Sequence, residues 1–273
     1  MFKLKSLLNI DKIIGWSLKI EKRFRFVIST LILSLIMLFS TFFLFDKAWF
    51  FIPVLAIAVY LFTYFSIIEE IEKSELLTLF IVPILFTVSY YLFYFLFPIR
   101  WLTRVPFVGI YAVSIYAILL TSNILNVGVE KSLQLYRAAF SVNYFYQSVI
   151  VFLFSNILFS FHGGYMVNAI VAGIGIFPLS LQLFWSVKLN LNIEKQLLMY
   201  SFLTAIIIAQ IAIITSFIPF RPSISGLIIT SSYYSLAGLI NAHLDDRLFK
   251  QTIKEYVFVL VFVVLIALLT ISW

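Results

Sequence analysis

Nine blocks of about 20 residues in this sequence contain no Lys, Arg, Asp or Glu, apart from Arg25 at the very start of the first block. At a rise of about 1.5 Å per residue, each block is long enough to cross a hydrocarbon core of about 30 Å. Lipid offers the backbone no hydrogen bonds, so such blocks must be helical. With 63% hydrophobic and 11% charged residues, the chain has too little polar surface for a water-soluble fold. The sequence therefore predicts an all-α, polytopic transmembrane helix bundle.

The predicted spans are separated by short polar connections and leave no room for a soluble domain, so residues 24–273 are expected to form a single transmembrane domain. The spans are 24–45, 48–68, 76–98, 105–125, 142–161, 165–187, 196–218, 222–242 and 256–273.

Two segments have the pattern of helices that lie in the headgroup layer rather than across the membrane. Residues 1–23 are basic and amphipathic, with Lys5, Lys12 and Lys19 opposite apolar positions, and we expect them to bind anionic lipid headgroups. The longest connection, 126–141, also alternates apolar and charged positions, which predicts a second, short interfacial helix.

The basic residues are distributed unequally between the two sides of the predicted bundle. With the N-terminus inside, 15 of the 19 Lys and Arg residues fall on the inner side. Positive charge favours the cytoplasmic side, so we expect a cytoplasmic N-terminus and an external C-terminus. The net charge of +7 is thus attributed to membrane orientation and not to nucleic-acid binding. A cell membrane of the bacterial inner-membrane type, or its equivalent, is the expected location.

Tryptophan positions agree with this arrangement. Trp16, Trp49, Trp101, Trp185 and Trp273 all fall at predicted span ends. An amphipathic indole ring prefers the membrane interface, so each ring is expected to lie there.

A cluster of potentially chemical side chains lies at the predicted cytoplasmic end of the eighth span. His243, Asp245, Asp246 and Arg247 could hold a divalent cation or position a phosphate-bearing ligand. A solvated helix end, with Asp246 and neighbouring residues paired to the following lysines, explains the same residues. The acidic segment 69–75 is predicted on the same side, so the two acidic regions could also act together as a metal site.

The sixth span combines a polar stripe with residues that weaken a helix. Asn168, Gly175 and Gln182 lie on one face, and Pro178 is beside them. Proline removes a backbone hydrogen bond, which predicts a kink or break of the kind that transporters use for substrate sites. Close helix packing with interhelical hydrogen bonds is the alternative.

The eighth span carries a related stripe that includes Ser231 and Ser235. If the sixth and eighth spans face each other, their stripes could line one cavity that opens toward His243. The other amides at depth are expected to hydrogen-bond neighbouring helices. These residues are Asn123, Asn143, Gln147, Asn156 and Gln210.

Three functions are compatible with these features. We favour permease-like handling of a small neutral or lipid-like molecule past the sixth span. The second is a non-catalytic membrane subunit or scaffold of an envelope complex, with a membrane-protein partner. The third is a metal-dependent lipid or isoprenoid transferase at the cytoplasmic face. We identify no catalytic residues and expect no cofactor, so a non-enzymatic function is favoured.

Overall fold

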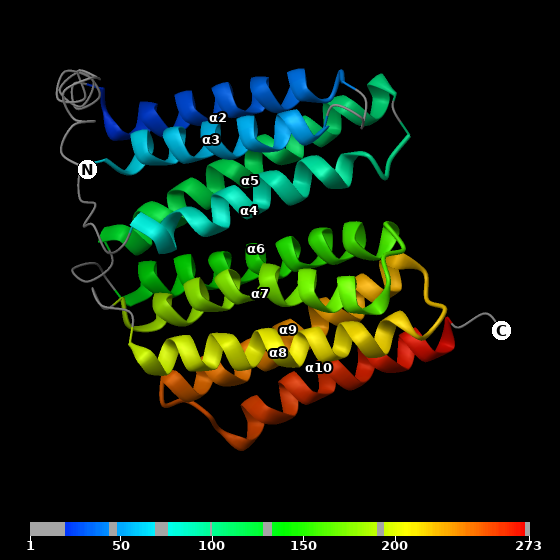
Figure 1. Cartoon of the computed structure of the whole chain (residues 1–273). Helices are drawn as coiled ribbons and strands as arrows, with labels where there is room; N and C mark the ends of the chain where they lie inside the picture. Colours follow the sequence, from blue (N-terminus) through cyan, green and yellow to red (C-terminus); the bar gives the residue numbers. More distant parts are fainter. Residues whose placement is uncertain are drawn as a thin grey trace.

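The structure, a computed structural model, describes residues 20–43, 48–68, 76–98, 100–127, 133–189 and 194–270. These residues form nine α-helices and no strand (Figure 1). The helices are α2 (Lys22–Ser40), α3 (Ala48–Ile67), α4 (Leu76–Tyr94), α5 (Trp101–Val127), α6 (Leu133–Ser160), α7 (Tyr165–Lys188), α8 (Lys195–Ser216), α9 (Pro222–Leu244) and α10 (Lys250–Leu269). Each predicted span corresponds to one helix. Eight helices are long and apolar enough to cross a membrane, and α4 is a shorter apolar helix.

Successive helices run in alternating directions, so α2 begins at one end of the bundle and α10 finishes at the other (Figure 1). We call the end at which α2, α4, α6 and α8 begin the inner end, after the predicted orientation, and the opposite end the outer end. The predicted interfacial helix at 1–23 lies outside the described residues except for its last few positions. The acidic segment 69–75 also lies outside them.

The prediction of a separate, short interfacial helix within 126–141 is wrong. Helix α5 continues to Val127, and α6 begins at Leu133 as a single helix of 28 residues. Residues 133–141 contain neither glycine nor proline, so nothing in this segment interrupts the helix that follows. The amphipathic pattern belongs to the first turns of a long helix.

Two packed groups of helices make up the bundle (Figure 1). Helices α2 to α5 contact one another, and α6 to α9 form the second group around the α6–α9 and α7–α8 pairs. Contacts of α4 with α6 and α7, and of α5 with α6, join the groups. Helix α10 lies at the edge and packs mainly on α9. Ala267 is its only buried residue, so almost all of α10 is left to the surroundings.

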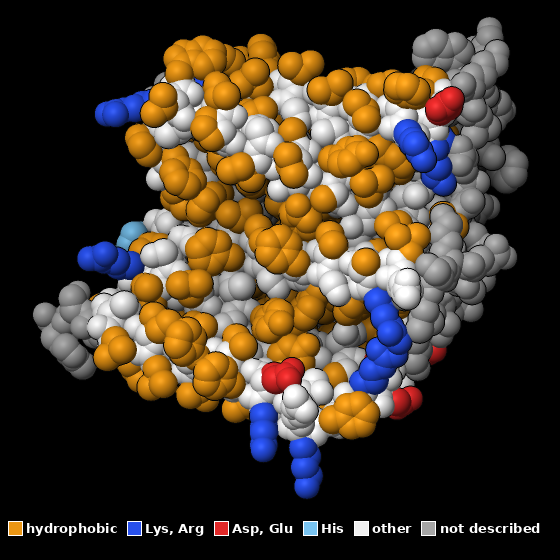
Figure 2. Space-filling model, turned by 180° about the vertical axis from the view of Figure 1, so that it is seen from behind, with side chains coloured by type: hydrophobic (Ala, Val, Ile, Leu, Met, Phe, Trp, Pro, Cys, Tyr) orange, Lys and Arg blue, Asp and Glu red, His pale blue; other side chains and the backbone are white. Residues whose placement is uncertain are grey.

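Hydroxyl and amide side chains of the helices lie mainly inside the bundle, whereas large apolar side chains lie both in the core and on the outer surface. In α2, Ser29 and Ser40 are fully buried, whereas Leu31 and Leu35 are 59% and 64% exposed. The Ser66 hydroxyl of α3 donates to the Ser29 hydroxyl at 2.9 Å, so the inward groups hydrogen-bond between helices. Figure 2 shows apolar side chains spread across one face, with most Lys and Arg side chains toward its margins. Such a surface suits lipid, since water would leave these side chains unfavourably exposed.

Two large side chains near helix ends, Trp185 and Arg25, are buried inside the bundle. Trp185 is 1% exposed and packs with Leu79, Phe80 and Leu125 in a small cluster near the ends of α4, α5 and α7, so its ring faces the protein, and its interfacial depth stays a prediction. Trp49 and Trp101, by contrast, are exposed at the outer-end starts of α3 and α5. Arg25 lies in the first turn of α2 and is fully buried among the helices.

Candidate functional site

The predicted stripe of the sixth span lies on α7 and is turned into the bundle. Asn168 is 3% exposed, and its amide donates to the Ser216 hydroxyl of α8 at 3.0 Å. A Cβ atom added at Gly175 would lie 2.7 Å from the ring of Phe154, so this glycine lets α6 pack closely. Helix α7 continues unbroken through Pro178, so the predicted break is not present; a kink remains a prediction.

Gln182 belongs to a buried group of side chains that joins three helices, which we call the amide core: Asn143 and Gln147 of α6, Gln182 of α7 and Tyr233 of α9. Asn143 donates to Oε1 of Gln182 at 3.0 Å, and the Gln147 amide donates to the same oxygen. The Tyr233 hydroxyl in turn donates to Oε1 of Gln147 at 2.5 Å. Gln147 and Tyr233 are both 0% exposed. The core therefore connects α7 to α9 through α6.

The serines of the eighth span lie on α9 and are also buried. The Ser231 hydroxyl donates to the Ile228 carbonyl of its own helix at 3.1 Å. Ser235 reaches a different helix, because its hydroxyl donates to the carbonyl of Tyr256 on α10 at 2.9 Å. The structure thus places both stripes inward, but their members meet different neighbours.

A polar cavity lies where α6, α9 and α10 come together at the inner end, and we call it the inner chamber. Its volume is about 660 Å³. Arg137, Asp245 and Arg247 are exposed at its rim. The other lining residues are Tyr136, Phe140, Ser141, Val187, Gly238, Asn241, Ala242, Phe249, Thr252 and Tyr256.

The charges at the rim of the chamber are unequal. Arg247 pairs with Asp245 at 3.2 Å, with both side chains about half exposed. Arg137 makes no ion pair with any residue that the structure describes. Among the described residues, Arg137 is therefore a cation of the rim without an ion-pair partner.

Three aromatic rings from α6, α9 and α10 lie together beside the chamber. The ring of Tyr144 stacks on Tyr234, with centroids 4.9 Å apart, and its hydroxyl donates to the Tyr234 carbonyl. The ring of Tyr256 lies 5.5 Å from Tyr234, and it also lines the chamber. A Cβ atom at Gly238 would lie 2.4 Å from the Tyr256 ring. Any side chain at position 238 would therefore clash with the Tyr256 ring.

The members of the predicted metal or phosphate cluster point in different directions. The exposed His243 ring packs edge-on against Tyr200 of α8, with centroids 6.2 Å apart. Asp245 faces the chamber and Arg247, while Asp246 is exposed with a left-handed backbone, φ 54°. The described part of the chain contains no group of three or more His, Cys, Asp or Glu side chains placed to bind a metal ion. Metal or phosphate binding here remains a prediction.

Sequence reasoning found half of this site. It singled out Gln182 and Ser235 and expected Asn143 and Gln147 to hydrogen-bond other helices, which is confirmed. It missed the role of Tyr233 and the chamber residues contributed by α6 and α10. For Gln210 the expectation is wrong, because its side chain is exposed on α8 and makes no hydrogen bond with any described residue. The several tyrosines within α6 and α9 are the sequence feature that could have indicated these residues.

An open polar chamber and a buried hydrogen-bonding core, with the Tyr144, Tyr234 and Tyr256 rings beside them, thus form one candidate site. Comparisons of the chain with protein-family models, with curated proteins and with solved structures gave no match.

Proposed function

We propose that the protein is a permease-like membrane protein that handles a small neutral, hydrogen-bonding molecule. The observation that carries the proposal is the inner chamber of about 660 Å³, whose lining residue Ser141 comes two positions before Asn143 of the amide core on α6. A chamber of this size falls in the range of small-molecule sites, about 300–1,000 Å³. It would admit the molecule from the inner end, and the aromatic rings would close the path beyond it.

The chemistry of the amide core supports a neutral solute. Its members offer amide and hydroxyl groups, none of them charged. Such groups can exchange hydrogen bonds among themselves for hydrogen bonds to a solute at little cost, whereas an ion would need a counter-charge. We propose a cell membrane, of the bacterial inner-membrane type, as the location, with the inner end in the cytoplasm.

Osmotic swelling of proteoliposomes tests this function without knowledge of the natural solute. Vesicles with the purified protein are exposed to gradients of uncharged polyols of increasing size, and re-swelling is recorded by light scattering. We expect faster re-swelling than in protein-free vesicles, with a size cut-off. Gln147→Leu should reduce the rate, because it removes the central amide. Gln210→Leu is the matched control, since the same change is made at an amide outside the site.

The absence of native cysteines permits a second arm. Ser141→Cys places a thiol in the chamber, and a bulky membrane-impermeant thiol reagent applied from the inner side should block permeation. Rates equal to those of protein-free vesicles for every polyol would overturn the proposal.

The scaffold alternative is supported by Gln210. An amide on the apolar face of α8 suits a partner helix that returns its hydrogen bonds. Permeation absent in vesicles, together with cross-linking of Gln210→Cys to another membrane protein, would favour this function.

A further inference from the structure

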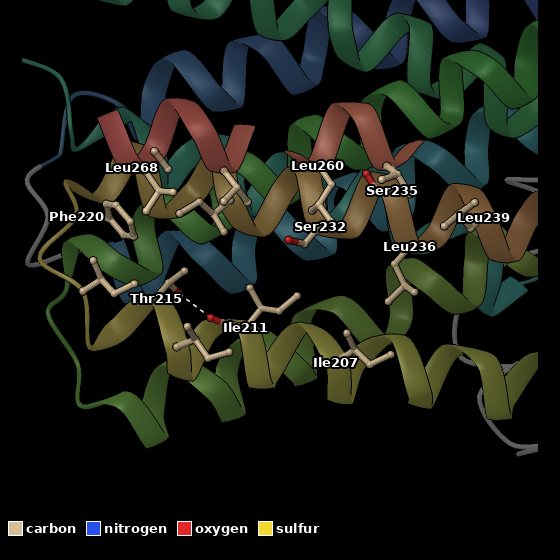
Figure 3. A pocket seen from close by; sticks show the side chains of 16 residues that line it. Ile207, Ile211, Thr215, Phe220, Ser232, Ser235, Leu236, Leu239, Leu260 and Leu268 are labelled. Carbon is tan, nitrogen blue, oxygen red and sulfur yellow. Dashed lines mark hydrogen bonds between the residues drawn. The ribbon is translucent and has the colours of Figure 1, made fainter. Parts of the chain in front are cut away.

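A long apolar groove lies between α8, α9 and α10 (Figure 3). Its lining residues on α9 are on another side of that helix from those of the inner chamber. The groove encloses about 440 Å³. Its walls are branched and aliphatic side chains such as Ile211, Leu236 and Leu260. The Thr215 and Ser235 hydroxyls bond to backbone carbonyls, so they offer a ligand little. Such a groove favours a hydrocarbon occupant.

The length of the groove matches one lipid chain. Along α9 it extends from Ile228 to Leu239, which at about 1.5 Å per residue corresponds to about 17 Å. That length is close to half of a hydrocarbon core of about 30 Å, the depth that one leaflet supplies. The groove reaches the outer end, where Phe220 and Leu268 line it (Figure 3). An acyl chain of the outer-end leaflet would therefore lie along it.

A basic residue lies next in the chain to the outer-end lining of the groove. Arg221 follows Phe220 directly and is the residue before α9. It is exposed and forms no ion pair with any residue that the structure describes. A lipid phosphate at this level would meet the guanidinium, which binds phosphate with paired hydrogen bonds.

A second apolar groove in the same protein lacks this feature. It lies between α7 and α8, is lined by residues such as Gly173 and Ala209, and encloses about 520 Å³. None of its lining residues adjoins a charged residue in the chain. The two grooves thus share apolar walls and differ in whether a charged residue adjoins the lining in the chain.

We propose that the groove between α8, α9 and α10 is a binding site for an anionic phospholipid of the outer-end leaflet, with one acyl chain in the groove and the phosphate on Arg221. The site does not depend on the inner chamber or on permeation. It also gives α10, which packs mainly on α9, a second contact. The lipid would bridge α10 to α8.

Thermal unfolding in mixed micelles tests the site. The detergent-purified chain is titrated with phosphatidylglycerol or with phosphatidylcholine of the same acyl chains. A ligand that binds the folded state raises the melting temperature by mass action. We expect a larger, saturable rise with phosphatidylglycerol. Arg221→Gln should remove the difference between the lipids, whereas Arg100→Gln, an exposed arginine at the same end, should preserve it.

A variant that fills the groove distinguishes binding of the acyl chain from binding of the phosphate by Arg221. Ser232 lies on the groove wall, where its hydroxyl is turned toward the space beside Ile211 (Figure 3). Ser232→Phe should abolish the rise with either lipid, and Ala209→Phe, which fills the other groove, should not. Equal rises with both lipids in the unmodified protein, or equal losses in Arg221→Gln and Arg100→Gln, would overturn the proposal. The arginine variants alone decide the question if Ser232→Phe does not fold.

Discussion

The hydroxyl of Tyr233 donates to Oε1 of Gln147 at 2.5 Å, between two residues that are fully shielded from the surroundings. This bond joins α9 to α6, and Gln147 passes the connection on to Gln182 of α7. In a membrane, apolar contacts alone distinguish poorly between protein and lipid, so hydrogen bonds of this kind help to fix which helices pair.

Tyr233→Phe and Gln147→Leu should therefore be energetically coupled. Removing either group leaves the other without its partner in an apolar interior, and a double-mutant cycle isolates that shared term. We expect a coupling of about 0.6–1.7 kcal/mol, the range found for hydrogen bonds between membrane helices. Equilibrium unfolding in bilayer-like micelles measures it. Tyr233→Phe combined with Thr87→Val, which breaks a separate Thr87–Tyr111 bond, should be additive.

Gly238→Ala should destabilise the protein and disturb the inner chamber. The new methyl group would lie 2.4 Å from the Tyr256 ring and 2.7 Å from the Tyr144 hydroxyl, so the ring must move into the chamber or α10 must move away. Overpacking of this kind costs about 1–3 kcal/mol. The check is the free energy of unfolding, together with the labelling rate of a thiol at Ser141→Cys.

The control for this substitution is Gly109→Ala in α5. A Cβ atom there meets nothing within 4 Å, so the change should stabilise the helix by about 0.5–1 kcal/mol. Adding Tyr256→Ala to Gly238→Ala should relieve the clash. A Gly238→Ala protein as stable as the Gly109→Ala protein would contradict the packing described here.

The number and position of the helices could be predicted because the bilayer fixes the length of any charge-free span. Which face of each helix points into the bundle could not be predicted from the sequence. In a helix that is apolar all round, periodicity gives little contrast between sides, and the sequence cannot distinguish a Trp185 that faces the protein from one that faces lipid. The same uncertainty placed Gln210 inside the bundle, although it lies outside.

The candidate site shows the same division. Gln182 and Ser235 were identifiable as polar groups within apolar spans. Their partners, Gln147 on α6 and the Tyr256 carbonyl on α10, depend on which helices are neighbours, and no local pattern encodes that. The chamber could not be predicted either, because it forms only where parts of α6, α9 and α10 meet.

If the cluster at 243–247 is a solvated helix end and not a metal site, added metal should leave the thermal stability unchanged. His243 packs against Tyr200 and Asp245 is paired with Arg247, so the described carboxylates and imidazole do not converge. Melting of the purified protein with and without Mg²⁺ or Mn²⁺ measures the effect. A rise that disappears in the Asp245→Ala/Asp246→Ala variant would instead favour the metal-dependent transferase.

The same double variant should be nearly as stable as the unmodified protein when no metal is present. The Arg247–Asp245 pair is about half exposed, and exposed pairs contribute only about 0–1 kcal/mol. A larger loss would mean that these carboxylates have partners beyond Arg247.

Gln210→Leu should leave the isolated protein as stable as before, or make it more stable. The amide is exposed on a helix face whose neighbours, such as Ile206 and Ile214, are apolar, and it bonds to no described residue. Leucine removes a polar group from hydrocarbon without removing an internal hydrogen bond. Gln147→Leu, the same change inside the amide core, should destabilise because Gln182 and Tyr233 each lose a partner. Unfolding of both variants in micelles gives the comparison. If Gln210→Leu lowered stability only when the protein was measured in its native membrane, a partner chain would cover α8, and the scaffold function would gain the stronger support.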